Sequence, residues 1–294
     1  MPPSFTFFVR TSFVIIEPHA KEYAMIDIRD QLFHHLDTKR FVATLTAERA
    51  GVLSGAEDAY RLAESIGVEL KLNKTEGAPV SHLEVIGHLS GAAKHIAQAE
   101  ESLIGTLAKA SGIATAANTA MLLADGRVGI VCGGWKKMPP ELKHVVRRAI
   151  ASGGASFRIT EPPMLYLDKN FIRMLGSIPQ ALEACAPFEG HARVVQIKGL
   201  ACPIEEEAEQ AVRGGCDILM VDTGDLETLD RCAVKVRQLG ARGSLKLAFA
   251  GGIKLTHIPD ICTHDIDILC VGKEIVDAPL LDIRLDVVGA ESWD

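Results

Sequence analysis

The chain has 294 residues, of which 48% are apolar and 23% are charged, and this composition of a folded globular protein excludes a disordered chain. Its length allows roughly two domains of about 150 residues each. Lys and Arg number 31 against 38 Asp and Glu, and the net charge of −7 argues against nucleic acid or an anionic membrane surface as the main partner.

Seven cysteines are scattered along the chain without a C-x-x-C pair. The odd number and the spacing indicate reduced thiols in a cytoplasmic protein, most of them small core residues. No apolar run reaches the roughly 20 residues that a membrane-spanning helix needs. Residues 1–24 have neither a basic start nor a small-residue cleavage site, so we expect an N-terminal tail rather than a signal peptide.

Residues 25–126 mix helical and strand patterns. Apolar residues recur at helical spacing over 56–66 and 92–110. Between these two helices, residues 68–80 and 82–91 contain short strand patterns joined by Gly and Pro turns. We therefore expect this region to form a first domain of mixed helices and strands.

Residues 127–275 have a regular rhythm, in which helical patterns flank strand-like runs at 128–132, 193–199, 217–222, 245–252 and 267–272. This alternation predicts parallel strands with right-handed crossovers, arranged in a complete or open barrel. A doubly wound sheet is the alternative, but no G-x-G-x-x-G follows the first strand. In the last segment, 276–294, the alternating run LLDIRLDVV predicts a strand that returns to the first domain.

Glycines end two consecutive predicted strands of this second domain. AFAGGIK places Gly251 and Gly252 at the end of one strand, and CVGK places Gly272 and Lys273 at the end of the next. Barrels often bind a phosphate at such loops, because glycines let backbone N–H groups approach an anion. The alternative is that the glycines merely terminate the strands. The pairing of two such ends with a lysine favours a phosphate site.

Asp222 ends the strand ILMVD. A carboxylate at this position is suited to hold Mg²⁺ or to bind sugar hydroxyls. The alternative is a helix N-cap role for Asp222, Thr223 or Asp225 ahead of LETLDRCAV. We favour the site for Asp222 and the cap for Asp225.

A third cluster follows the first strand of the second domain, where Trp135, Lys136 and Lys137 present a ring and two cations. Lysines there suit pyrophosphate oxygens, although two adjacent lysines also fit a solvated turn. Arg158 lies just past two further glycines in SGGASFR and gains a role only in the context of the other segments.

Taken in order, these segments resemble the quinolinate phosphoribosyltransferase (nicotinate-nucleotide pyrophosphorylase) family. The resemblance runs from about residue 43 to residue 288 and includes GVLSG, AEESLIGTLAKASGIAT, WKKMPP, GGASFR, ILMVD, AFAGGI, DILCVG and LLDIRL. It implies the type II phosphoribosyltransferase fold, with an N-terminal α/β sandwich domain and an open α/β (TIM-like) barrel. It also implies phosphoribosyl pyrophosphate and Mg²⁺ as ligands, and a homodimer in which the partner's N-terminal domain covers each barrel mouth.

The chain departs from the family pattern where the acceptor would bind. The family's D-T-R-K-T-T-P-G reads G-G-W-K-K-M-P-P here, which keeps Lys136 but puts Trp135 in place of the arginine. The family's N-H-R becomes S-F-R, with Phe157 in place of the histidine, and its E-R helix start becomes E-E, with Glu101 in place of the arginine. Fewer cations imply an acceptor with less negative charge than quinolinate.

A second departure concerns the metal and the ribose. The family's V-E-x-E strand becomes V-Q-I-K, so Gln196 and Lys198 replace two carboxylates, and L-D-K-N-F at 167–171 replaces the K-D-N-H segment. Asp222 and the glycine-bearing loops are kept. We therefore expect a weakened Mg²⁺ site that retains Asp222.

The residues and the resemblance together predict a phosphoribosyltransferase-like enzyme whose acceptor is an aromatic or heteroaromatic ring other than quinolinate. In this interpretation Lys136 binds pyrophosphate, Asp222 binds the metal or the ribose hydroxyls, and the glycines with Lys273 bind the 5-phosphate. The acceptor is held by a set of predicted substrate-binding residues, Glu101, Trp135, Phe157, Arg158 and Lys198.

Three alternatives stay open. The first is a quinolinate phosphoribosyltransferase proper, and the second is a barrel that binds a nucleotide or sugar phosphate without transferring ribose. The third makes Lys198 a Schiff-base lysine, since it lies near a predicted strand end and desolvation activates lysines.

Overall fold

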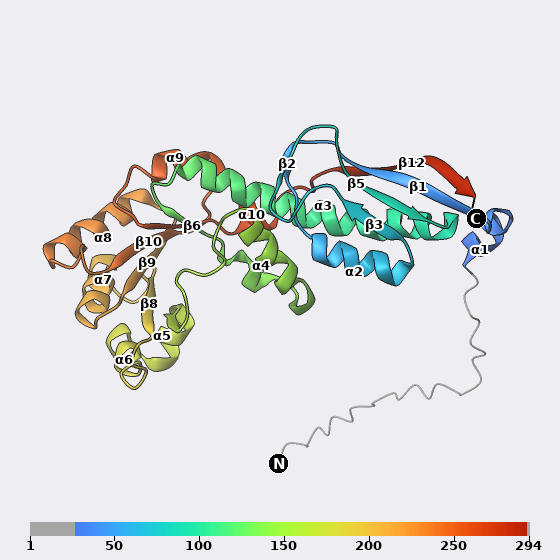
Figure 1. Cartoon of the computed structure of the whole chain (residues 1–294). Helices are drawn as coiled ribbons and strands as arrows, with labels where there is room; N and C mark the ends of the chain where they lie inside the picture. The colour runs from blue at the N-terminus through green and yellow to red at the C-terminus, as the bar shows by residue number, and fades with distance from the viewer. Residues whose placement is uncertain (1–26, 293–294) are drawn as a thin grey trace, which may run out of the picture.

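The computed structural model describes residues 27–292, which form an N-terminal sheet domain and a barrel domain joined by one long helix (Figure 1). The expected tail over residues 1–24 lies outside the described residues. Within the described range, no helix is both long and apolar enough to cross a membrane.

The N-terminal domain is built around a four-stranded antiparallel sheet in the order β12-β1-β5-β3. Its strands are β1 (Lys39–Ala47), β3 (Glu69–Leu72), β5 (Glu84–Gly91) and β12 (Ile283–Ser292), and a short separate pair consists of β2 (Gly51–Val52) and β4 (Pro79–Val80). The last strand pairs with β1, so the end of the described chain returns to the first domain as the alternating sequence predicts.

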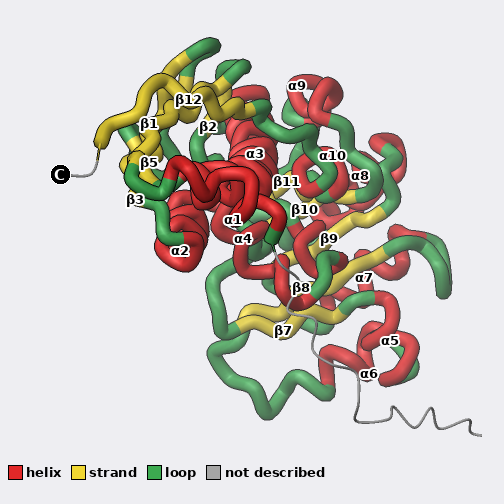
Figure 2. The backbone as a smooth tube through the Cα atoms, turned by 90° about the vertical axis from the view of Figure 1, so that its right-hand side faces the viewer, coloured by secondary structure: helices red, strands yellow, loops and turns green. Residues whose placement is uncertain are grey.

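Helices cover one face of this sheet: α2 (Ala56–Ile66) and α3 (Ala93–Ala124), with α1 (Ile28–Phe33) and the 3-10 turn η1 (His34–Leu36) beside them (Figure 2). Alternate residues of β1 point into the core, where Leu45 is completely buried and clusters with Leu103 and Leu107 of α3. Burial of each such leucine contributes about 1.5–3 kcal/mol relative to an exposed side chain. This apolar layer fixes α3 on the sheet.

The helix α3 has 32 residues and connects the two cores. Leu107 belongs to the core of the N-terminal domain, whereas Ile113, Ala117 and Ala120 belong to the core of the barrel. The sequence pattern predicts a helix only to residue 110. The helix continues to Ala124 because the following run is rich in alanine, the residue with the highest helix propensity.

The second domain contains six parallel strands in the order β6-β11-β10-β9-β8-β7. The strands are β6 (Gly129–Val131), β7 (Met164–Leu167), β8 (Ala192–Ile197), β9 (Ile218–Asp222), β10 (Lys246–Ala250) and β11 (Ile268–Cys270). The five predicted strands are confirmed, and β7 is an addition. The barrel is open between β6 and β7, where a parallel bridge joins Val131 to Ser156.

The strands are surrounded by helices α4 (Lys143–Ser152), α5 (Lys169–Leu175), α6 (Ile178–Glu183), α7 (Ile204–Arg213), α8 (Leu226–Gln238), α9 (Ile258–Ile261) and α10 (Lys273–Val276). Three 3-10 turns accompany them, η2 (Gly133–Lys137), η3 (Pro140–Leu142) and η4 (Leu255–His257). The Asp225 side chain accepts from the Thr228 backbone N–H at 2.9 Å and caps α8, as its position predicts. Asp222 is therefore not the cap of α8 and is the last residue of β9.

Candidate active site at the barrel mouth

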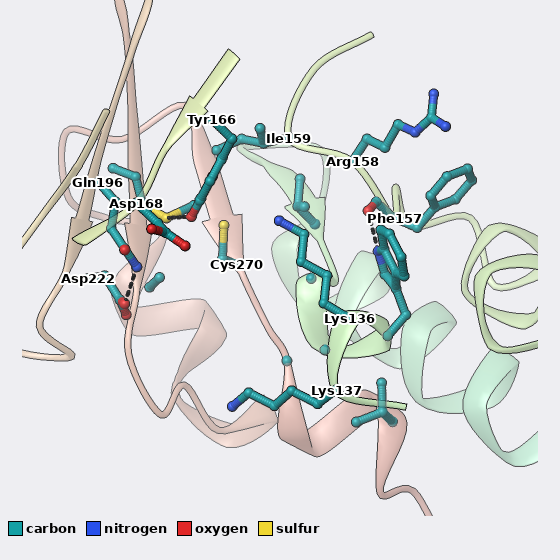
Figure 3. A pocket seen from close by; sticks show the side chains of 18 of the residues that line it. Lys136, Lys137, Phe157, Arg158, Ile159, Tyr166, Asp168, Gln196, Asp222 and Cys270 are labelled. Carbon is teal, nitrogen blue, oxygen red and sulfur yellow. Dashed lines mark hydrogen bonds between the residues drawn. The ribbon is translucent and has the colours of Figure 1, made fainter. Parts of the chain in front are cut away.

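The carboxyl ends of the six parallel strands meet at one edge of the sheet and line a cavity of about 1260 Å³ (Figure 3). The loops that follow these strands contribute most of its lining, as is usual for barrel enzymes. The cavity collects the predicted residues Trp135, Lys136, Phe157, Arg158, Asp222, Gly251, Gly252, Gly272 and Lys273. Segments that lie far apart in the sequence therefore form one site.

The loops after β10 and β11 carry Gly251, Gly252 and Gly272, which we call the glycine loops. A Cβ on Gly251 would lie 2.3 Å from the Gly224 backbone nitrogen, so only glycine allows the loops after β9 and β10 to touch. Gly252 has a φ of +67°, and a Cβ there would meet nothing within 4 Å. Its backbone therefore borders open cavity space, as an anion-binding loop requires.

Four lysines line the cavity near the glycine loops: Lys136 and Lys137 from η2, Lys254 after β10 and Lys273 at the start of α10. All four side chains belong to exposed residues. The sequence-based set omits Lys254, although its position two residues after the glycine pair is a usable signal. Ammonium groups and glycine-rich backbone together favour a phosphorylated ligand on this side.

The floor of the cavity is apolar and contains one unpredicted aromatic ring, Tyr166 of β7 (Figure 3). The Lys136 ammonium lies 4.3 Å from the centre of this ring, and the Tyr166 hydroxyl donates to the Met220 sulfur at 3.0 Å. Burial, with help from the nearby acidic groups, raises the pKa of Tyr166 above its ordinary value. Tyr166 therefore stays neutral with the Lys136 ammonium over its ring, and Ile159 and Cys270 extend this floor.

Trp135 and Phe157 form an aromatic wall. The Trp135 indole N–H donates to the Phe157 carbonyl oxygen at 2.7 Å, and the two rings meet edge to face with their centres 6.4 Å apart. The Arg147 guanidinium covers the Trp135 ring at 4.9 Å, and Arg158 lies 5.3 Å from the Phe157 ring centre. These contacts hold the wall in place, so a planar ligand would meet a preformed surface.

Opposite the lysines lies a group that we call the carboxylate network, Gln196, Lys198 and Asp222. Asp222 Oδ2 accepts from Gln196 Nε2 at 2.5 Å and from Lys198 Nζ at 2.8 Å, and Lys198 Nζ also reaches the Asp222 carbonyl oxygen at 2.6 Å. Asp168 nearby caps α5 by accepting from the backbone of Asn170 and Phe171. The carboxylates of Asp168 and Asp222 on this side of the cavity are thus hydrogen-bonded to neighbouring groups of the protein.

A protein-held metal ion fits this network poorly. Asp222 Oδ2 is already shared by an ammonium and an amide, and no three His, Cys, Asp or Glu side chains among residues 27–292 gather as a metal site. Mg²⁺ usually binds one or two carboxylates, several waters and the phosphates of a substrate. The predicted metal role of Asp222 stays a prediction, and its carboxylate is already paired with the Lys198 ammonium.

Two thiols lie at the strand ends near the cavity. Burial raises the pKa of the Cys132 thiol to about 11, and burial, followed by the Asp222 charge, raises that of Cys270 to about 12. Both groups are therefore protonated at neutral pH. Because the thiolate is the reactive form, neither cysteine is suited to act as a nucleophile here.

Two predicted substrate-binding residues lie outside the main cavity. Glu101 is in the first third of α3, on the N-terminal domain, where its exposed side chain accepts from Arg29 at 2.8 Å. Lys198 lines a second, smaller cavity of about 280 Å³ and reaches the main one only through Asp222. The Schiff-base alternative needs a free amine, whereas this ammonium is held by Asp222.

An open α/β barrel with glycine loops at its mouth and a second sheet domain define the class of barrel phosphoribosyltransferases. Residues 27–111 match the model of the quinolinate phosphoribosyl transferase N-terminal domain, and residues 113–286 match that of its C-terminal domain. The chain belongs to the quinolinate phosphoribosyl transferase family.

Named relatives agree with this assignment. The chain is 28% identical to the nicotinate-nucleotide pyrophosphorylase of Rattus norvegicus, over 83% of this chain and 80% of the relative. It is 25% identical to a probable nicotinate-nucleotide pyrophosphorylase of Methanothermobacter thermautotrophicus, over 85% and 89% of the two chains. The solved structure of the nicotinate-nucleotide pyrophosphorylase from Francisella tularensis shares the fold, with a TM-score of 0.77, 23% identity and 92% coverage of both chains.

Proposed function

We propose that the protein transfers a 5-phosphoribosyl group from phosphoribosyl pyrophosphate to an aromatic or heteroaromatic ring other than quinolinate. The observation that carries the proposal is the division of one cavity into two parts. Glycine loops with Lys137, Lys254 and Lys273 line one part, while Tyr166, Trp135 and Phe157 supply a floor and a wall of rings, with the Lys136 ammonium over the Tyr166 ring. Membership of a pentosyltransferase family supports the reaction type.

In the proposed reaction a nitrogen or oxygen of the acceptor forms a bond to the anomeric carbon of ribose as the bond to pyrophosphate breaks. A pyridine nitrogen becomes a pyridinium, whereas an azole or phenol releases its N–H or O–H proton to solvent. Positive charge builds on the ribose and negative charge on the leaving group. The Lys136 ammonium neutralises pyrophosphate, and the Asp222 carboxylate accepts hydrogen bonds from ribose hydroxyls. The glycine loops and Lys273 anchor the 5-phosphate. Mg²⁺ carried by the substrate would supply further neutralisation of the leaving group's charge.

The choice of acceptor follows from the charges at the wall. Trp135 and Phe157 stand where the family pattern has an arginine and a histidine, and they are bonded to each other rather than left as free donors. An aromatic contact adds about 0.5–1.5 kcal/mol beyond area burial, whereas each lost hydrogen bond to a charged group costs about 1.5–3 kcal/mol. At this wall a dicarboxylate therefore loses more binding free energy than a neutral ring gains.

Glu101 enters this proposal through a second copy of the chain. Its place on α3 separates it from the cavity of its own chain. In a homodimer of the family type, the N-terminal domain of one subunit covers the barrel mouth of the other. We propose this assembly in the cytoplasm, with Glu101 facing the acceptor and disfavouring an anionic ring.

Turnover with a panel of acceptors tests the function. The protein is incubated with phosphoribosyl pyrophosphate, Mg²⁺ and each of quinolinate, nicotinate, neutral pyridines, azoles and phenols, and phosphoribosylated product and pyrophosphate are measured. We expect product from a neutral or singly charged ring and loss of product in Lys136→Met. Lys235→Met serves as the control, because Lys235 pairs with Glu209 on the outer helices.

Two results would redirect the assignment. If quinolinate is the only acceptor in the panel that gives product, the protein is a quinolinate phosphoribosyltransferase proper. Tight binding of phosphoribosyl pyrophosphate without product from any acceptor would favour a barrel that binds the sugar phosphate without transferring it. The loss of the two carboxylates at Gln196 and Lys198 is the observation behind this second candidate.

A further inference from the structure

The carboxylate network contains an internal cation at a place where a metal ion would otherwise balance Asp222. We propose that Lys198 is the permanent counter-ion of Asp222 and that the cavity binds phosphoribosyl pyrophosphate without a divalent cation. This inference rests on the proposed function, because it concerns the same ligand. It adds that the metal-free form of that ligand is the one recognised.

The geometry of the pair fits a built-in counter-ion. In the register of β8 and β9, Gln196 lies opposite Met220 and Ile197 opposite Val221, so the next step places Lys198 beside Asp222. The ammonium contacts both the carboxylate and the carbonyl oxygen of Asp222. The Asp222 side chain is 20% exposed and that of Lys198 is 30% exposed, so solvent screens the pair only in part.

The two side chains occupy different sides of the network. Asp222 lines the main cavity, whereas Lys198 lines the smaller cavity behind it. Lys198 therefore acts through Asp222 rather than on the ligand. A bare carboxylate at this place would repel the diphosphate and the phosphate of the ligand, and the ammonium cancels that repulsion.

Glu207 of α7 fixes the position of Lys198. Its side chain accepts backbone N–H bonds from Lys198 and Gly199 through Oε2, at 2.9 and 2.8 Å, and from Leu200 and Ala201 through Oε1, at 2.9 and 3.1 Å. The residue is only 5% exposed. Four bonds to one carboxylate hold the loop after β8 and keep the Lys198 backbone beside the end of β9, so Glu207 is a positioning residue.

A divalent cation bound through Asp222 Oδ2 would have to displace this ammonium. The Gln196 amide already donates a hydrogen bond to the same oxygen. The side-chain oxygen of Gln196 in turn accepts from the Lys169 backbone N–H at 3.2 Å. A metal at this oxygen would thus break two existing contacts before it gained one ligand. The structure favours the arrangement in which the lysine stays.

Calorimetric titration of the full-length protein with phosphoribosyl pyrophosphate, once in EDTA and once in excess Mg²⁺, tests the inference. For the unmodified protein we expect the two dissociation constants to agree within about threefold. Lys198→Met should weaken binding in EDTA by at least about tenfold, and Mg²⁺ should restore most of the loss. Lys198→Arg keeps the positive charge and should bind in EDTA nearly as well as the parent.

Two further variants separate charge from structure. Lys198→Met combined with Asp222→Asn removes the unbalanced carboxylate as well, so binding in EDTA should recover relative to Lys198→Met alone. Lys235→Met is the matched control, because Lys235 also pairs with a carboxylate, that of Glu209 at 3.1 Å, and has 27% exposure, but lies away from the cavity. Thermal unfolding of each variant checks that it is folded.

The outcomes distinguish this inference from the proposed function. Binding by the unmodified protein only with Mg²⁺ overturns the inference and leaves the function standing. An equal loss in Lys198→Met with and without Mg²⁺ also overturns it, because it would show a structural role. Absence of binding under both conditions overturns the function and the inference together.

Discussion

The two sides of the cavity are built in different ways. The proposed phosphate side consists of glycine backbone and lysines that are exposed residues, so it depends on turns that directly follow the strands. The carboxylate network depends on side chains that are bonded to one another across β8 and β9. A local feature can be preserved while the sequence around it changes, whereas a network changes as a unit when one member is replaced.

The largest effect on binding is expected from Gly252→Asp on the side of the glycine loops. A carboxylate there would meet the phosphate at hydrogen-bond distance, and like charges about 4 Å apart repel by about 4 kcal/mol at an effective dielectric of 20. We expect binding of ribose 5-phosphate, measured by calorimetry, to weaken by at least about 100-fold.

The matched control is Gly252→Asn, which tolerates the φ of +67° and has a similar shape without the charge. It should lose much less affinity than the aspartate variant. A folded Gly252→Asp protein that binds ribose 5-phosphate as tightly as the parent would remove the phosphate from this loop.

Glu207→Gln tests whether the side of the cavity that contains the carboxylate network depends on the hydrogen bonds that hold the loop after β8. The amide keeps the shape but offers one acceptor oxygen to four backbone donors, and hydrogen bonds to a charged group contribute about 1.5–3 kcal/mol each. We expect a loss of about 2–4 kcal/mol in the free energy of unfolding by urea.

Glu209→Gln is the comparison for this variant, because Glu209 forms partly exposed pairs with Arg213 and Lys235 on the outer helices. Such pairs are worth about 0–1 kcal/mol, so its unfolding should change little. Similar urea unfolding midpoints for the two variants would contradict the role of Glu207 in holding the loop after β8.

The contrast between the two sides also explains what the sequence alone could predict. The glycine loops and the lysines of η2 were predictable, because turn residues after apolar strands signal their structure locally. β7 was missed, and with it the Tyr166 floor, because each of the other five strands is followed within two residues by a glycine, whereas the next glycine after β7 is Gly176. The pairing of Lys198 with Asp222 depends on the register of two strands more than twenty residues apart, which no local pattern specifies.

Acceptor choice should shift when charge is returned to the wall. Trp135→Arg combined with Glu101→Arg supplies two donors for carboxylates, each worth about 1.5–3 kcal/mol when fully engaged. We expect quinolinate to gain at least about tenfold over a neutral pyridine in competition binding. Trp135→Phe combined with Glu101→Gln, which adds no cation, should produce a smaller shift. Equal preferences in the two double variants would exclude these positions from the acceptor site.

The smallest effect concerns alkaline pH. Burial raises the pKa of Cys132 to about 11 and that of Cys270 to about 12, whereas unfolded thiols ionise near about 8.5. The unfolded chain therefore releases these protons first, so this contribution to stability is complete below pH ~8.5 and is lost as pH rises towards the folded values. Urea unfolding between pH 8 and 10 should show a shallower decline in Cys132→Ala with Cys270→Ala than in the parent. An unchanged decline would show that other groups control it.

The central claim is that one cavity keeps a phosphoribose side and has replaced a dicarboxylate side by rings. Calorimetry on the unmodified protein tests it most directly, first with phosphoribosyl pyrophosphate and then, on the saturated protein or with ribose 5-phosphate in its place, with quinolinate, nicotinate and an uncharged pyridine. We predict binding of the sugar phosphate and tighter binding of the uncharged ring than of quinolinate. Tighter binding of quinolinate than of either other ring would contradict the account.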